Sequence, residues 1–190
     1  MKTFIVLIAM LASAHSFSQS EPVLVDVPSD DQIAQSLDFT GKPGVIVTAT
    51  MVKTDGDYGS LMITHKKPND VRYYVGAMND TLFQLNESLA GYTTLDKNAA
   101  GSLLINSAND SVGRDRWSRT LTVAYRNNKY LIVGYTYSSI DTYTMKSEEC
   151  DYNLQTKKGT RNKKAVRIAT GSIDLNKWVD AEKFFTCKGW

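Results

Sequence analysis

The chain has 190 residues, of which 42% are hydrophobic, so it is long enough to form one domain with a buried core. Its 22 lysines and arginines nearly balance its 20 aspartates and glutamates, and a net charge of +2 does not favour nucleic-acid binding. The charges are nevertheless unevenly spread, because acidic groups dominate residues 21–38 and basic groups dominate residues 157–167.

The N-terminal segment, MKTFIVLIAMLASAHSFSQS, has the features of an export signal. Lys2 precedes an unbroken apolar run from Phe4 to Leu11, and small residues follow that run. The run is too short to span a bilayer, and no later segment is apolar enough to do so. We therefore predict a signal peptide over residues 1–18, cleaved between residues 14 and 20, and a soluble, single-domain product over residues 19–190.

The segment SDDQIAQSL, at residues 29–37, predicts a short helix at the start of that domain. Ser29 or Asp30 is a suitable N-cap residue, and acidic side chains in the first turn stabilise the same end of a helix. The pattern after this segment is no longer helical.

Strands are predicted for most of the remaining chain, because short β-branched and aromatic runs alternate with clusters of Gly, Asn, Asp and Pro. These runs, about eight in number, are residues 44–52, 60–66, 71–78, 82–89, 102–108, 117–126 and 129–140, and a hairpin around GTRNK at 159–163. The expected fold is mainly β, a single antiparallel domain arranged as a meander, a sandwich or a propeller-like sheet. A helical turn is expected in the C-terminal stretch DLNKWVDAEKFF.

The chain has two cysteines, Cys150 and Cys187. An even count in an exported chain predicts one disulfide, and the pair lacks the C-x-x-C spacing of reactive thiols. The bridge would fasten the C-terminal tail onto the strand around Cys150.

The stretch TLTVAYRNNKYLIVGYTY, at residues 120–137, predicts a hairpin. Asn127 and Asn128 can both adopt positive φ, as a two-residue type I′ turn requires. The register that follows pairs Tyr125 with Tyr130, Val123 with Ile132 and Leu121 with Gly134. The opposite row pairs Thr120 with Tyr135 and continues to Tyr137. This second row is mixed in polarity, so it is either covered by another layer or forms a recognition surface.

Catalytic signatures are scarce. His65 is the one histidine that could activate a nucleophile, and its setting in ITHKKPND predicts an exposed histidine at a strand end. Glu148 and Glu149 are neighbouring carboxylates, but adjacent residues of a strand point to opposite faces. We therefore predict a protein without catalytic residues.

Metal ligands are equally few. Asp55 and Asp57 flank a glycine, as oxygen donors do in calcium loops, but the other ligands of an EF-hand are missing. A DG turn accounts for the stretch without a metal, and we predict no metal and no cofactor. Whether Asp55 and Asp57 bind calcium stays open at this point.

Two groups of residues could contact a partner. Aromatic and arginine side chains, which commonly anchor protein interfaces, are Tyr135, Tyr137, Arg126, Tyr143, Trp117 and Arg119. A basic patch, suited to a negatively charged partner, comprises Lys157, Lys158, Arg161, Lys163, Lys164 and Arg167. Lysine-rich turns also serve solubility and protect sheet edges, which is the alternative explanation of the patch.

Two segments resemble known sequences. DFTGKPGVIVT, at residues 38–48, resembles a degraded FG-GAP/VCBS-type repeat, in which Asp38 and Gly41 fit the loop pattern and Thr40 and Gly44 depart from it. Residues 113–159 are similar to a segment of uncharacterised exported bacterial proteins. Together the segments cover about a third of the chain. The resemblance implies the periplasm of a Gram-negative bacterium and supplies no activity.

These features favour a non-catalytic periplasmic or secreted binding protein. Export, a disulfide-stapled β scaffold and surface aromatic residues suit an inhibitor or immunity-type protein that recognises a protein partner. A carbohydrate- or lipid-binding envelope module is the first alternative. A peptidoglycan-directed hydrolase, whose acidic groups only the fold would bring together, is the second.

Overall fold

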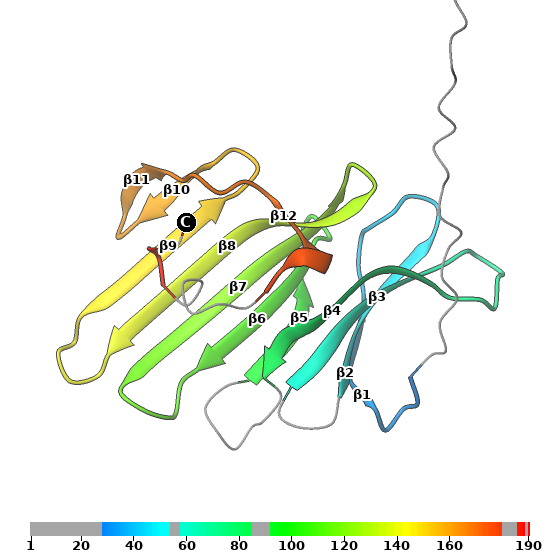
Figure 1. Cartoon of the computed structure of the whole chain (residues 1–190), viewed down its shortest axis with the longest axis horizontal. Coiled ribbons are helices and arrows are strands. Elements are labelled where there is room, and N and C mark those ends of the chain that lie inside the picture. The colour runs from blue at the N-terminus through cyan, green and yellow to red at the C-terminus, as the bar shows by residue number, and fades with distance from the viewer. Residues whose placement is uncertain (1–27, 54–57, 85–91, 180–185, 189) are drawn as a thin grey trace, which may run out of the picture.

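Antiparallel β-strands account for nearly all the described regular structure in the computed structural model (Figure 1). The structure describes residues 28–53, 58–84, 92–179, 186–188 and 190. The mainly β, antiparallel fold predicted from the sequence is confirmed. The predicted signal peptide and the turn that contains Asp55 and Asp57 lie outside the described residues.

The strands form two sheets in which neighbours in space are mostly neighbours in the chain. The first sheet, in the order β1-β2-β3-β4, contains β1 (Ile33–Asp38), β2 (Ile46–Lys53), β3 (Tyr58–Lys66) and β4 (Tyr74–Gln84). The second sheet contains β5 (Tyr92–Lys97), β6 (Leu103–Asn109), β7 (Asp115–Arg126), β8 (Lys129–Asp141), β9 (Ser147–Asn153), β10 (Lys158–Arg161), β11 (Lys164–Arg167) and β12 (Ile173–Asp174). Its order runs from β11 back to β5, and β12 pairs with β8.

The predicted N-terminal helix at residues 29–37 is wrong, because the second half of this segment is strand β1. Ser29 does cap a turn, since its amide and hydroxyl donate to Gln32 Oε1 at 3.1 and 2.8 Å. From Ile33 onward, burial alternates with a period of two, as it does in a half-buried strand. Pairing along β2 outweighs the weak local preference for a helix.

β4 is one continuous strand, where the sequence predicts a turn at Asn79-Asp80 between two strands. Asn79 is buried, and its side-chain amide donates to the carbonyls of Leu175 at 2.7 Å and Trp178 at 2.8 Å. Asparagine is locally unfavourable in a strand, but these bonds satisfy its amide and tie β4 to the 3-10 helix η1 (Leu175–Lys177). η1 is the helical turn expected near the C-terminus.

One buried cluster joins the inward faces of both sheets. Its members that are entirely buried include Ala49, Leu61, Ile63, Leu103, Ile105, Leu121, Val123 and Ile132. Gln35 of β1 also links the sheets, because its side chain donates to the carbonyl of Leu95 and accepts from its amide, both at 2.7 Å. These two bonds occupy backbone groups on the edge of β5 that would otherwise be unpaired.

The turn between β7 and β8 confirms the predicted hairpin. Asn127 and Asn128 have φ values of 51° and 61°, as a type I′ turn requires. Tyr125 lies opposite Tyr130, and their ring centroids are 5.1 Å apart.

Further from the turn the predicted register is wrong, because β8 contains a β-bulge at Val133. Leu121 therefore pairs with Tyr135 and not with Gly134. The bulge lies where β8 changes neighbour, since β9 pairs with it up to Gly134 and β12 pairs beyond that point. A Cβ at Gly134 would lie only 3.0 Å from Thr122 Oγ1, so the close strand approach suits glycine there.

The C-terminal residues pack on the core-facing side of β8 and β9. The predicted Cys150–Cys187 disulfide is confirmed, and both cysteines are buried. The ring of Trp190 contacts those of Tyr135 and Trp178, with centroid distances of 4.4 and 6.1 Å. The tail thereby covers aromatic side chains that the larger sheet would otherwise expose.

Candidate functional site

Three of the six predicted partner-binding residues are buried. Tyr135, Tyr137 and Arg119 are 1%, 5% and 3% exposed. The two tyrosines are buried because the bulge in β8 turns both of them to the core side. Their predicted place on the opposite row is wrong. Burial raises the pKa of both phenols above the ordinary value for tyrosine. These residues therefore build the sheet interior, and the surface candidates that remain are Arg126, Tyr143 and Trp117.

His65 lies at the end of β3, but it is half-buried between the sheets and not exposed as predicted. Its Nε2 is 2.6 Å from the hydroxyl oxygen of Tyr130. A Cβ at Gly76 would lie 2.5 Å from this Nε2, so the neighbouring strand reaches the pair only because it carries a glycine. Burial, and secondarily the nearby Lys42, lower the pKa of His65. The pair is a structural contact between β3 and β8.

Tyr143 lies in the loop between β8 and β9 and is 82% exposed. Met145 in the same loop is 68% exposed, and Val112 in the loop between β6 and β7 is 44% exposed. We call Val112, Tyr143 and Met145 the loop-tip cluster. Scattered apolar side chains are ordinary on a surface, whereas several on two adjoining loops indicate a contact site.

Arg114 and Asp141 brace these two loops against each other. Arg114 Nε donates to Asp141 Oδ1 at 2.8 Å, and the Nη2 and Oδ2 atoms complete a bidentate pair. Asp141 Oδ1 also accepts from the amides of Tyr143 and Thr144. The Arg114 guanidinium, together with these amides, holds the pKa of the Asp141 carboxyl well below its usual range.

Thr142 adds to this brace, because its amide and its hydroxyl both donate to the carbonyl of Arg114, at 3.1 and 2.8 Å. The Arg114 guanidinium also lies 5.3 Å from the centroid of the Tyr143 ring, a cation–π distance. The exposed tyrosine is thus presented on a fixed platform.

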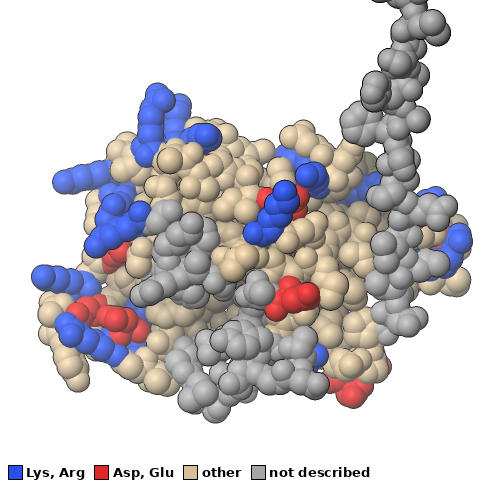
Figure 2. Space-filling model, in the orientation of Figure 1, with Lys and Arg blue, Asp and Glu red and all other residues tan. Residues whose placement is uncertain are grey.

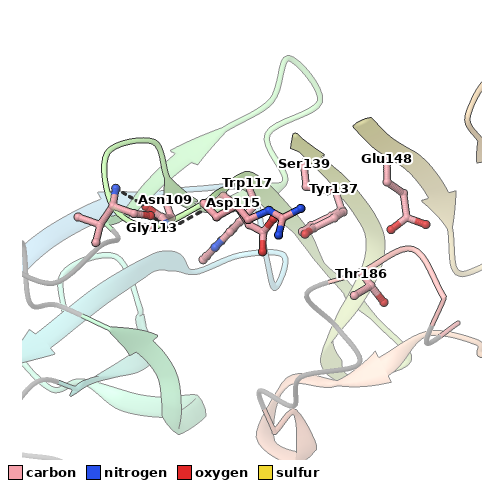
Figure 3. Close-up of a pocket in the computed structure, with 10 residues that line it drawn as sticks. Asn109, Gly113, Asp115, Trp117, Tyr137, Ser139, Glu148 and Thr186 are labelled. Atoms are coloured by element: carbon pink, nitrogen blue, oxygen red, sulfur yellow. Dashed lines mark hydrogen bonds between the residues drawn. The ribbon is translucent and has the colours of Figure 1, made fainter. Parts of the chain in front are cut away.

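An open pocket of about 500 Å³ lies beside the loop-tip cluster, where β6–β9 end (Figure 3). We call it the strand-end pocket. Figure 3 shows Trp117, Tyr137, Ser139 and Glu148 on adjacent strands, with Thr186 approaching from the C-terminal segment. The residues that line the pocket are Asn109, Val112, Gly113, Arg114, Asp115, Trp117, Tyr137, Ser139, Glu148 and Thr186.

The basic patch lies on β10, on β11, in the loop before them and in the turn between them, and Figure 2 shows lysine and arginine side chains gathered at the upper left, over these strands. Arg161 Nη2 is 3.1 Å from Glu148 Oε1, so this arginine is committed to an ion pair. The other members, Lys157, Lys158, Lys163, Lys164 and Arg167, are exposed. β11 is also the last strand of its sheet, which keeps edge protection as an alternative role.

Among the described residues, no group of three or more His, Cys, Asp and Glu could hold a metal ion. Glu148 points inward toward Arg161, whereas Glu149 is exposed, so the two carboxylates do not converge. No helix in the described part of the chain is long and apolar enough to cross a membrane.

Comparison with known proteins finds no match to a family model, to a curated protein or to a solved structure. The resemblances noted for residues 38–48 and 113–159 therefore stay predictions.

Sequence reasoning missed the brace and the pocket. Asp141 precedes Thr-Tyr-Thr, and an Asp whose side chain accepts from the next amides is a recognisable turn signal. Nothing local indicates its pairing with Arg114, which lies 27 positions away. The same holds for Thr186 and Glu148, which only the folded tail brings to one pocket.

Proposed function

We propose that the chain is an exported, non-catalytic binding protein, of the inhibitor or immunity type, that recognises a protein partner through the loop-tip cluster. The observation that carries the proposal is the exposure of Tyr143 and Met145 on a braced pair of loops. Tyrosine, methionine and arginine are enriched where protein interfaces bury their central residues.

The rigidity of the platform supports this proposal. Association costs the conformational freedom of every side chain and loop that must be ordered. Asp141 and Thr142 already fix the loop that carries Tyr143, so little of that cost remains to be met on binding. The geometry suits a partner with an apolar depression that accepts the two side chains.

Charge near the loops indicates the chemistry of the partner. Lys146 follows Met145 directly, and the basic patch lies on β10, which pairs with β9, on β11 beyond it and in their loops. A partner surface rich in aspartate or glutamate would be attracted to this side of the molecule and orientated on it. We therefore assign an acidic protein surface as the partner.

A disulfide in the core supports export, because such bonds persist in oxidising compartments such as the periplasm. The absence of catalysis is supported by the contacts of Glu148, whose carboxylate is occupied by Arg161 and by the amide of Cys187 at 3.4 Å. A carboxylate held in this way is poorly placed to transfer protons to a substrate.

A photo-crosslinking amino acid at position 143 tests the proposal. In an extract of the source organism's extracytoplasmic fraction, we expect it to trap one acidic protein, identified by mass spectrometry. The matched control places the same group at Thr136, an exposed position on the outer face of β8. Capture from both positions, or from neither, would contradict the proposal.

Alanine substitutions measure how much Tyr143 contributes to the affinity for the partner. With the trapped partner purified, Tyr143→Ala should weaken binding by about tenfold or more, because exposed aromatic anchors dominate interface energy. Arg126 lies at the β7–β8 turn, outside the loop-tip cluster, and the matched control is Thr136→Ala on the outer face of β8, which should change the Kd less than about twofold.

A further inference from the structure

The loop between β3 and β4 holds an aliphatic side chain out in solvent. Val71 is 86% exposed, the largest exposed fraction among the large hydrophobic residues described. The loop around it is ordered, because Asp70 Oδ1 accepts from the amide of Arg72 at 3.0 Å and the two side chains form a bidentate pair at 3.1 and 3.2 Å. Arg72 also lies 5.9 Å from the centroid of the Tyr74 ring. Val71 therefore projects from a fixed loop and does not contribute to the core.

A second exposed aliphatic residue and a tyrosine lie at the same end of the first sheet. Ile46, at the start of β2, is 46% exposed and pairs with Lys66 at the end of β3. The ammonium group of Lys66 lies 5.1 Å from the centroid of the Tyr73 ring. Tyr73 is in turn two residues from Val71. Aliphatic, aromatic and cationic side chains therefore lie together across the ends of β2, β3 and β4.

Two further lysines lie beside these side chains. Lys67 follows Lys66, and Lys42 is in the loop between β1 and β2. The amide of Lys42 donates to the hydroxyl of Tyr130 at 3.4 Å, and that hydroxyl contacts His65 at the end of β3. None of the three lysines forms an ion pair with another described residue. We call the following residues the lysine–valine surface: Lys42, Ile46, Lys66, Lys67, Val71 and Tyr73.

This surface carries an excess of positive charge. Residues 38–48 and 64–75, which contain it, have only Asp38 and Asp70 as carboxylates. Asp70 is bound to Arg72, and Asp38 accepts from the hydroxyl of Thr48 at 2.6 Å. The lysines are left to attract an anionic ligand.

The combination of these side chains selects a lipid surface among anionic ligands. A free phosphate would contact the lysines and leave Val71 and Ile46 in water. Protein interfaces are depleted in lysine, and the arginine of this loop is committed to Asp70. At a membrane, aliphatic side chains enter the acyl boundary, tyrosines lie among the headgroups and lysines are attracted to anionic lipids. We propose that the lysine–valine surface binds an anionic phospholipid membrane, with Val71 inserted at the tip of the loop.

Membrane contact at this surface would direct the loop-tip cluster away from the lipid. β8 begins near the surface, where Tyr130 contacts His65, and ends at Asp141 beside the loop-tip cluster. Its 13 residues span about 40 Å at the usual rise of a strand. Figure 1 shows the β3–β4 loop at the right of the view and the β6–β7 and β8–β9 loops at the lower left. The two surfaces can therefore be occupied at the same time.

Co-sedimentation of the exported chain with lipid vesicles tests the proposal. The chain should bind vesicles of equimolar phosphatidylglycerol and phosphatidylcholine about tenfold or more tightly than vesicles of phosphatidylcholine alone. Lys42→Ala/Lys67→Ala should weaken binding to the mixed vesicles by about tenfold or more. The matched control, Lys163→Ala/Lys164→Ala, removes the same charge from the basic patch and should change it by less than about twofold.

Val71→Ser tests insertion of the loop tip. It should weaken vesicle binding by about fivefold or more, because the side chain loses its burial in the acyl boundary. Its thermal unfolding should match that of the native chain, since Val71 is exposed in the fold. Unchanged vesicle binding by this variant would contradict insertion.

Three other results would overturn the inference: no binding to the mixed vesicles, equal binding to neutral vesicles, or equal effects of the two lysine double substitutions. Loss of crosslinking from position 143 in Lys42→Ala/Lys67→Ala would instead assign these lysines to the protein partner. Tyr143→Ala should leave vesicle binding unchanged, so this inference and the proposed protein contact can fail independently.

Discussion

The hydrogen bond between His65 and Tyr130 is one of the closest side-chain contacts between the two sheets. The Tyr130 ring also packs against Phe39 and Tyr125, with ring centroids 5.9 and 5.1 Å away. The imidazole of His65 therefore lies beside a cluster of aromatic rings. In such surroundings the neutral imidazole is favoured over its charged form. A residue that the sequence indicates as exposed thus becomes part of the joint between the sheets.

Acidification should weaken this joint. Because the pKa of His65 is lowered in the folded state, its contribution to stability is present above the unfolded-state pKa of about 6.5 and is lost as the pH falls through the folded-state pKa. The difference in free energy of unfolding between the native chain and His65→Gln should therefore shrink from pH 7.5 to pH 5. Urea unfolding at each pH measures it, and a difference independent of pH would contradict the assignment.

At the scale of elements, the turn and the bulge of the β7–β8 hairpin each set a different part of its register. The two asparagines set the first pairs of the register, and the bulge at Val133 then reverses which side chains of β8 face the core. Tyr135 and Tyr137 are buried as a result. The hairpin therefore supplies core packing, and the residues that we propose for recognition lie on the loops at its far end.

The turn can be tested at Asn128, which has a φ of 61°. Asn128→Gly should raise the free energy of unfolding by a few tenths to about 1 kcal/mol, because Asn-Gly is the preferred type I′ pair. Asn128→Val should lower it by about 1–2 kcal/mol, because a β-branched residue is strained at positive φ. Urea unfolding measures both, and equal stability of the two variants would show that the turn does not set the register.

At the scale of the whole molecule, the C-terminal tail completes both the core and the strand-end pocket. Trp190 packs on Tyr135, and Thr186 contributes to the pocket wall. The disulfide connects this tail to β9 across a sequence separation of 37 residues. The loop-tip cluster depends on a different brace, since Arg114 and Asp141 join two loops without the tail.

Removal of the Cys150–Cys187 disulfide should destabilise the packing of the C-terminal tail and leave the loop-tip cluster in place. A Cys150→Ala/Cys187→Ala variant should lose about 2–4 kcal/mol of stability, because its unfolded chain regains the freedom that the closed loop removes. Under conditions where the variant is still folded, crosslinking from position 143 should persist, because the Arg114–Asp141 brace does not involve the tail. Guanidinium unfolding and crosslinking provide the two readouts, and loss of crosslinking in the folded variant would show that the loop-tip cluster depends on the tail.

The sequence by itself determined the class of fold, because alternation, turn residues and cysteine spacing are local signals of strands, hairpins and a disulfide. It also placed Tyr143 among the surface residues, since a loop position in a β domain is exposed by default. It could not determine the strand β1, where pairing along β2 overrode a weak helix signal.

Only the tertiary structure decided which tyrosines are buried and where the candidate sites lie. A one-residue bulge reverses which side chains of a strand face the core, and the bulge in β8 lies where β12 replaces β9 as its neighbour. The Arg114–Asp141 brace and the pocket beside Trp117 likewise join residues from separate strands and from the tail. Such contacts are set by how the strands pair and pack together, and they join residues that are far apart in the sequence.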